Sequence, residues 1–114
     1  MATLYSFLNP EYVGETMSHE CVQVLRGTPW FDTVDQEHVP LEIVNLCGRD
    51  VIIDFEVLGL PNKEVVYRSG NVRIGSSGKH AVEIVTDKYY ESLEVKVAVK
   101  NKKPHLVSVE IQLR

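Results

Sequence analysis

Asp54 and Glu56 are two acidic residues whose types and spacing could perform chemistry. They stand at alternate positions of an apolar stretch, so in an extended strand both carboxylates point to one face, about 7 Å apart. That separation could suit the acid/base pair of a glycosidase. The solvent face of any half-buried strand carries the same alternation, and we interpret the pair in that simpler way.

Metal and nucleophile motifs are weak in this sequence. His19 and Cys21 are two residues apart and could point to one side of a strand, but this is only half of a zinc motif, and the other histidines are scattered. Gly75–Gly78 is too short for a phosphate loop and lacks its lysine, and no serine stands in a Gly-x-Ser-x-Gly elbow. We therefore expect no metal, no cofactor and no enzymatic activity.

Adjacent aromatic residues stand in an acidic stretch, residues 27–40, between Pro29 and Pro40. This stretch is long and irregular, and a capping pattern at Thr33 and Gln36 favours one helical turn inside it. We expect one aromatic to be anchored in the core while the acids Asp32, Asp35 and Glu37 face solvent as one flank of a binding surface. The candidate binding residues here are Trp30, Phe31, Asp32 and Asp35.

Lys102 and Lys103 form the second candidate binding site, at the tip of a predicted hairpin loop over 101–104. A basic tip can meet an acidic partner, and it can also protect a sheet edge from pairing with other chains.

Alternation with a period of two is the main structural signal. Residues 51–57, 93–99 and 107–113 place apolar side chains at every second position, which is typical of strands with one buried face. The predicted core consists of Val51, Ile53, Phe55, Val57, Leu93, Val95, Val97, Val99, Val107, Val109 and Ile111. Residues 41–46 and 51–58 are expected to pair as a hairpin through the turn at 48–50. Shorter strands are predicted at 3–8, 20–25, 64–68, 72–74 and 80–85.

The strand list predicts one all-β domain over residues 1–114, an antiparallel β-sandwich of about seven or eight strands. Its order resembles an immunoglobulin-like sandwich in outline, since Tyr89 or Tyr90 lies at a corner before a strong strand. The cysteine and tryptophan spacing of antibody domains is absent. A jelly roll or an open barrel would give a similar strand list.

Cysteine usage and charge suggest a compartment and exclude some partners. We expect Cys21 and Cys47 to be free thiols, and the N-terminus lacks the pattern of a secretion signal, so a cytoplasmic location is expected. No apolar run approaches membrane-spanning length, so no membrane insertion is expected. The net charge is −4, and the acidic excess lies in the first third of the chain, which argues against nucleic-acid binding.

These observations favour a non-enzymatic interaction or scaffold module that binds a protein partner or itself through edge-rich sheets. One alternative is a structural subunit of a larger assembly of the capsid or tail type. Another is a carbohydrate-binding module that uses Trp30, Tyr12, Tyr89 or Tyr90 as a stacking platform.

Overall fold

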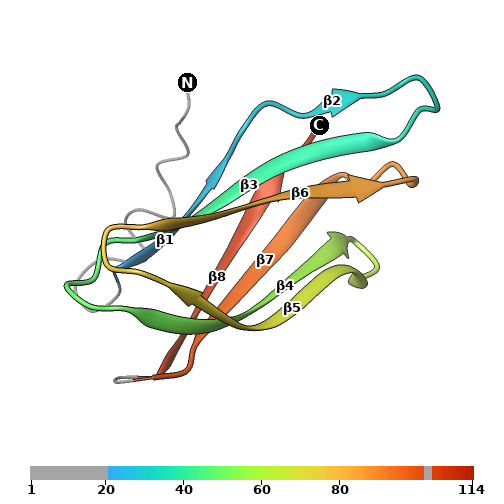
Figure 1. Ribbon diagram of the computed structural model, residues 1–114. Coiled ribbons are helices and arrows are strands. Elements are labelled where there is room, and N and C mark those ends of the chain that lie inside the picture. The colour runs from blue at the N-terminus through green and yellow to red at the C-terminus, as the bar shows by residue number, and fades with distance from the viewer. Residues whose placement is uncertain (1–20, 102–103) are drawn as a thin grey trace.

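The computed structural model describes residues 21–101 and 104–114, which form two four-stranded antiparallel sheets packed as a β-sandwich (Figure 1). The predicted β-sandwich is thus confirmed. The predicted strand at 3–8 and His19 lie outside the described residues. The strands are β1 (Val22–Arg26), β2 (Trp30–Phe31), β3 (Glu37–Asn45), β4 (Val51–Leu60), β5 (Glu64–Ile74), β6 (Lys79–Thr86), β7 (Ser92–Val99) and β8 (His105–Gln112).

In the first sheet, β3 is central. One edge of β3 pairs with β6, and the other edge pairs with β1 along residues 41–45 and with β2 along residues 37–38. The second sheet has the order β5-β4-β7-β8. Among the described residues, no helix is long and apolar enough to cross a membrane.

The core lies between the two sheets and is filled by the alternating residues that the sequence predicts. All eleven predicted core residues, from Val51 to Ile111, are buried, and Phe55 is among the largest fully buried side chains. The first sheet contributes the alternating residues of β1 and β3, together with Ile84 of β6. Burial of this apolar surface is the main driving force for association of the two sheets.

The predicted hairpin between residues 41–46 and 51–58 is wrong. β3 and β4 belong to different sheets, and the connection between them carries the chain across the sandwich (Figure 1). Both strands bury one alternating face, so the apolar pattern is equally compatible with one sheet or with two facing sheets. The pattern therefore does not distinguish a hairpin from a crossover.

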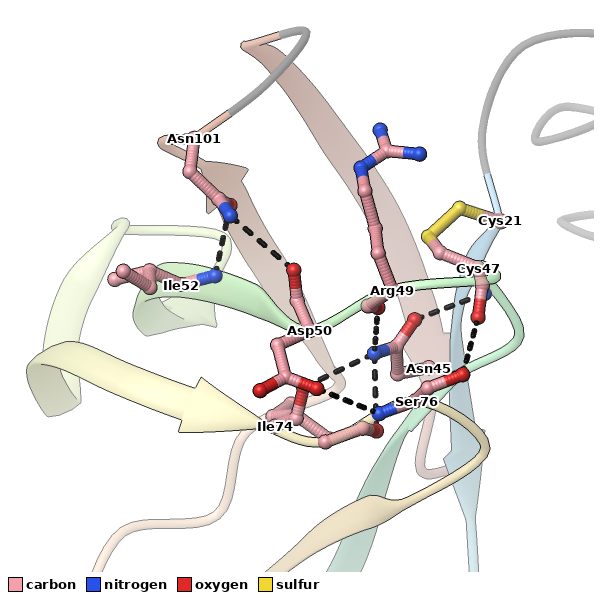
Figure 2. Close-up of a disulfide and its surroundings, with 10 residues drawn as sticks. Cys21, Asn45, Cys47, Arg49, Asp50, Ile52, Ile74, Ser76 and Asn101 are labelled. Atoms are coloured by element: carbon pink, nitrogen blue, oxygen red, sulfur yellow. Dashed lines mark hydrogen bonds between the residues drawn. A yellow bond between two sulfur atoms is a disulfide. The ribbon is translucent and has the colours of Figure 1, made fainter.

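The crossover is organised by Asn45, which is fully buried. Its amide nitrogen lies 2.9 to 3.0 Å from the carbonyl oxygens of Arg49, Ile74 and Gly75, and its amide oxygen accepts from the Cys47 N–H at 2.8 Å (Figure 2). One hydrogen must be shared, because a side-chain amide has two N–H donors for these three acceptors. We call this region, residues 45–50 with the chain at 74–75, the Asn45 corner.

A disulfide joins Cys21 to Cys47, with the Cα atoms 5.0 Å apart (Figure 2), so the prediction of free thiols is wrong. The pairing of β1 with β3 explains the bond. Val22 lies opposite Asn45, and the Leu46 N–H donates to the Cys21 carbonyl at 2.8 Å, so the two cysteines meet just beyond the ends of paired strands. The sequence does not show that Cys21 and Cys47 are close, because it does not reveal how β1 pairs with β3.

The segment at 64–74 forms the single strand β5 rather than two short strands. The register between β4 and β5 shifts between Ile53 and Phe55. Opposite the shift, Asn71 has a positive φ of 54° and its N–H donates to the Asp54 carboxylate. A β-bulge of this kind bends a strand without ending it. This explains why residues 69–71, between the two predicted strands, resemble a turn in the sequence.

Tyr90, at the corner before β7, is buried, and its hydroxyl donates to the Glu64 carboxylate at 2.6 Å. This hydrogen bond to Glu64, together with burial, raises the pKa of Tyr90 to about 12. The ring occupies the space beside Gly59, where a Cβ would overlap the Tyr90 ring. Gly59 therefore allows the tyrosine to pack against β4.

Candidate functional site

The stretch at 27–40 folds as a hairpin of β2 and the start of β3, not as an irregular loop with a helical turn. One Asp32 carboxylate oxygen accepts from the N–H groups of Val34 and Gln36 at 2.9 and 3.0 Å, which stabilises a tight turn. Asp35 has a positive φ of 64° in that turn. The side-chain bonds of Asp32 thus compete with helix formation and explain the difference from the prediction.

Pro40, predicted to end the loop, lies inside β3. Its carbonyl accepts from the Gly27 N–H at 2.9 Å, in the short gap between β1 and β2. The backbone nitrogen and carbonyl of a strand residue point toward the same neighbouring strand. The nitrogen of Pro40, which has no hydrogen to donate, therefore faces the gap between β1 and β2, where no ladder hydrogen bond is lost.

Neither Trp30 nor Phe31 is anchored in the core, so that prediction is also wrong. Their exposed fractions are 46% and 48%. They are adjacent in β2, so their side chains point to opposite faces. Trp30 lies on the outer face, where its ring stacks on His38 of β3 with the ring centroids 3.9 Å apart and the planes 12° from parallel.

His38 is held by a carboxylate at each ring nitrogen. Its Nε2 is 2.8 Å from the Asp32 carboxylate and its Nδ1 is 3.2 Å from that of Glu83 on β6. The hydrogen bond to Asp32, followed by the contact with Glu83, raises the pKa of His38, although desolvation opposes the shift. The same hydrogen bond is the main cause that lowers the pKa of Asp32. These contacts fix the imidazole on which Trp30 rests.

Phe31 belongs to a second aromatic group. Its ring lies 6.1 Å from that of Tyr89, and the Arg114 guanidinium lies 3.7 Å from the centroid of the Tyr89 ring. Two nitrogens of Arg114 donate to the two carboxylate oxygens of Glu37, which is only 2% exposed. Arg114 is therefore fixed by a bidentate ion pair and by a cation–π contact.

We call the exposed side chains Trp30, Phe31 and Tyr89, with the residues His38 and Arg114 that hold them, the aromatic end of the molecule. Carboxylates outnumber cations around it. The acidic residues are Asp32, Asp35, Glu37, Glu83, Asp87 and Glu91, and the cations are Lys88 and Arg114. An apolar surface with an acidic border is suited to binding a positively charged partner.

The structure brings some predicted site residues together and not others. Trp30, Phe31 and Asp32 lie at the aromatic end, and Asp35 is exposed in the adjoining turn. Lys102, Lys103 and Tyr12 lie outside the described residues. Tyr90 is buried and offers no open ring face.

Sequence reasoning missed His38, Glu83 and Arg114, and its expectation that Glu37 faces solvent is wrong, because Glu37 is buried. His38 lies opposite Trp30 and Glu37 lies opposite Phe31, while Glu83 and Arg114 come from β6 and the residues after β8. The only signal for His38 and Glu37 is their place in the acidic stretch at 27–40, which the sequence predicts to be irregular. The last two depend on which strands are neighbours.

Asp54 and Glu56 line a hollow of about 420 Å³ on the outer face of the second sheet. Each is ion-paired, Asp54 with Lys100 at 3.3 Å and Glu56 with Arg68 at 2.6 Å. The hydrogen bond from the Asn71 backbone N–H is the main cause that lowers the pKa of Asp54. This carboxyl therefore lacks the raised pKa that a general acid requires.

Metal ligands do not converge in the described parts of the chain, where no three His, Cys, Asp or Glu side chains are grouped to hold an ion. Cys21, half of the zinc motif considered above, is bonded to Cys47.

No protein family and no curated protein matches the sequence. Among solved structures, the X-ray structure of Northeast Structural Genomics Consortium target SoR45 is similar over 81% of this chain and 82% of that chain, with 9% identity and a TM-score of 0.46. The β-glucosidase DesR from Streptomyces venezuelae, crystallised with D-glucose, matches 79% of this chain but only 15% of its own, with 11% identity and a TM-score of 0.38. Similarity at this level carries no argument about function.

Proposed function

We propose that this β-sandwich is a non-enzymatic protein-binding module and that its contact surface is the aromatic end. The observation that carries the proposal is that Trp30, Phe31 and Tyr89 are exposed and yet held in defined orientations by ring and ion-pair contacts. Rigid aromatic side chains supply large contact area at small entropic cost, and they are enriched at the centres of interfaces.

Site-specific photocrosslinking in the source cells tests this proposal. A photoreactive phenylalanine analogue replaces either Val34, in the turn after β2, or Leu106, on β8; these residues are 70% and 57% exposed. We expect adducts with a protein from position 34, reduced when Trp30→Ala is added, and none from position 106. Crosslinks from position 106 alone, or from neither position, contradict the proposal.

Self-association is the simplest form of this function. Sedimentation velocity of the full chain, with and without Trp30→Ala, measures it. A dimer that the substitution dissociates identifies the partner as a second copy. An oligomer that survives the substitution favours the alternative of a structural assembly subunit with a different contact.

Carbohydrate binding is a second candidate, favoured by the 73% exposure of the Tyr89 ring. Sugars stack on flat aromatic faces, but Arg114 already lies over this ring, and Trp30 lies on the other face of β2 from Phe31. The aromatic side chains thus do not make one flat platform. Saturable binding of a glycan that Tyr89→Ala abolishes, with Trp30→Ala as a comparison, would favour this candidate over the first.

The disulfide supports a proposal about compartment that differs from the cytoplasmic expectation. Structural disulfides persist mainly in oxidising environments. We therefore propose that the chain functions where the Cys21–Cys47 bond stays oxidised. Alkylation of thiols in intact cells, followed by mass spectrometry, tests this: protection of both cysteines is expected, and alkylation of both contradicts it.

A further inference from the structure

Arg114 shows how this molecule binds a guanidinium group. One face of Arg114 lies on the Tyr89 ring, 3.7 Å from its centroid, and its nitrogens form a bidentate ion pair with Glu37. An aromatic face and a carboxylate are the two groups that a planar guanidinium recognises best. At this position the chain supplies its own arginine.

The same two kinds of group occur on the opposite face of β2, around Trp30. One face of the indole is covered by His38, and the side chain remains 46% exposed. Glu83 contacts the same histidine through one carboxylate oxygen. Its side chain is 46% exposed, and its second oxygen has no hydrogen bond among the described residues.

The charge balance around Trp30 favours a cation. Even when His38 is protonated, its one positive charge lies between the two negative charges of Asp32 and Glu83, so this group of three is negative overall in either state of the imidazole. The two cations of the aromatic end are already engaged, Arg114 with Glu37 and Lys88 with Glu64. A positively charged side chain of a partner would therefore be attracted to this surface without displacing a cation of the chain.

We propose that Trp30 and Glu83 form an open binding site for an arginine side chain of a partner protein, matching the site that Arg114 fills from within. The guanidinium stacks on the exposed face of Trp30 and donates to the free oxygen of Glu83. Arginine fits better than lysine because its planar group stacks and donates in a fixed geometry, whereas an ammonium is a compact, strongly hydrated charge. This inference rests on the proposed function, because it names the partner chemistry of the same surface.

Trp30 is the only tryptophan of the chain, so its fluorescence reports directly on the site. The probes are three capped pentapeptides, Gly-Xaa-Gly-Xaa-Gly, in which Xaa is arginine, lysine or citrulline. Citrulline keeps the planar shape of arginine without its charge. We expect the arginine peptide to change the Trp30 emission saturably, with an affinity at least about threefold above that for lysine and about tenfold above that for citrulline.

Two carboxylate variants test the geometry. Glu83→Gln is expected to weaken the arginine peptide about threefold to tenfold, and Glu110→Gln, on the second sheet, to leave its affinity unchanged. Circular dichroism confirms that both variants fold. Equal binding of arginine and citrulline, equal binding of arginine and lysine, or no effect of Glu83→Gln would overturn the inference.

The photocrosslinking experiment separates this inference from the proposed function. If position 34 captures a protein while the arginine peptide leaves Trp30 unchanged at millimolar concentration, the surface binds a partner by other chemistry and only the inference fails. If neither experiment detects binding, both fail.

Discussion

The two ends of β3 use polar groups in opposite ways. At the Asn45 corner, a buried amide binds backbone groups from two segments, residues 47–49 and 74–75, and a disulfide closes the region (Figure 2). At the aromatic end, ionic contacts of His38 and Arg114 support rings that face solvent. Buried polar groups that are fully satisfied hold a fold together, whereas exposed aromatics that are held rigid favour recognition. We therefore expect substitutions at the Asn45 corner to lower the stability of the fold, and substitutions at the aromatic end to weaken binding of the partner.

The largest expected difference is between two phenylalanines. Phe55→Ala should lower the free energy of unfolding by about 3–5 kcal/mol, because the fully buried ring leaves a cavity between the sheets. Phe31→Ala, at the aromatic end, should cost less than about 1 kcal/mol. Urea unfolding measures both values. Similar costs for the two substitutions would show that the aromatic end is part of the core.

Asn45→Ala should cost about 3 kcal/mol, because it removes the donors for the Ile74 and Gly75 carbonyls and the acceptor for the Cys47 N–H. Asn62→Ala, in the exposed turn after β4, is the control and should change the stability by less than about 0.5 kcal/mol. Chemical denaturation of the two variants compares them. A loss near that of the control would mean that water replaces the amide and that the corner does not depend on it.

Removing the disulfide with Cys21→Ala and Cys47→Ala should cost about 3.5 kcal/mol, the loop-closure entropy for a sequence separation of 26 residues. The Trp30 emission spectrum of the folded variant should match that of the unmodified chain, because Trp30 and Cys47 lie near opposite ends of β3. A shifted spectrum would mean that the two ends are coupled through the strand.

The smallest expected effect is a pH dependence at the aromatic end. The raised pKa of His38 means that its charged contacts stabilise the fold fully below the unfolded-state pKa of about 6.5, and that this contribution is lost as pH rises through the higher folded value. The lowered pKa of Asp32 gives the opposite case, with stability present above about pH 3.9 and lost as pH falls through the lower folded value. The Asp32–His38 ion pair therefore stabilises the fold most at pH values between about 3.9 and about 6.5.

His38→Gln tests this dependence, since glutamine cannot carry the charge. The groups that face His38 are Asp32, Glu83, Val85 and the Trp30 ring. We expect the difference in thermal midpoint between the unmodified chain and this variant to be greater near about pH 5 than near about pH 9. An equal difference at both values would mean that the ring stack, and not the ion pairs, carries the contribution of His38.

The strands β4, β7 and β8 of the second sheet were predictable from the sequence, because the alternation of apolar and polar residues identifies their buried faces. Phe55, Val97 and Val109 are examples of predicted core residues, and all three are buried. Period-two alternation follows from strand geometry alone, so it needs no knowledge of which strands are neighbours.

The features that depend on which strands lie side by side were not predictable from the alternation of residues. The sequence is compatible with a hairpin at 41–58, with free Cys21 and Cys47, and with a core-anchored Trp30, yet tertiary structure decided each point otherwise. In every case the outcome depends on the strand register and on which sheet a strand joins.

The candidate site shows the same division. The sequence by itself determined most of the strands, the buried faces of β4, β7 and β8, and the aromatic and acidic composition of residues 30–35. Only the tertiary structure brought Glu83 to His38 and Arg114 to Tyr89 and Glu37. Alternation is a local property of consecutive residues, whereas a site is made by residues that become neighbours only when separate strands pair and pack.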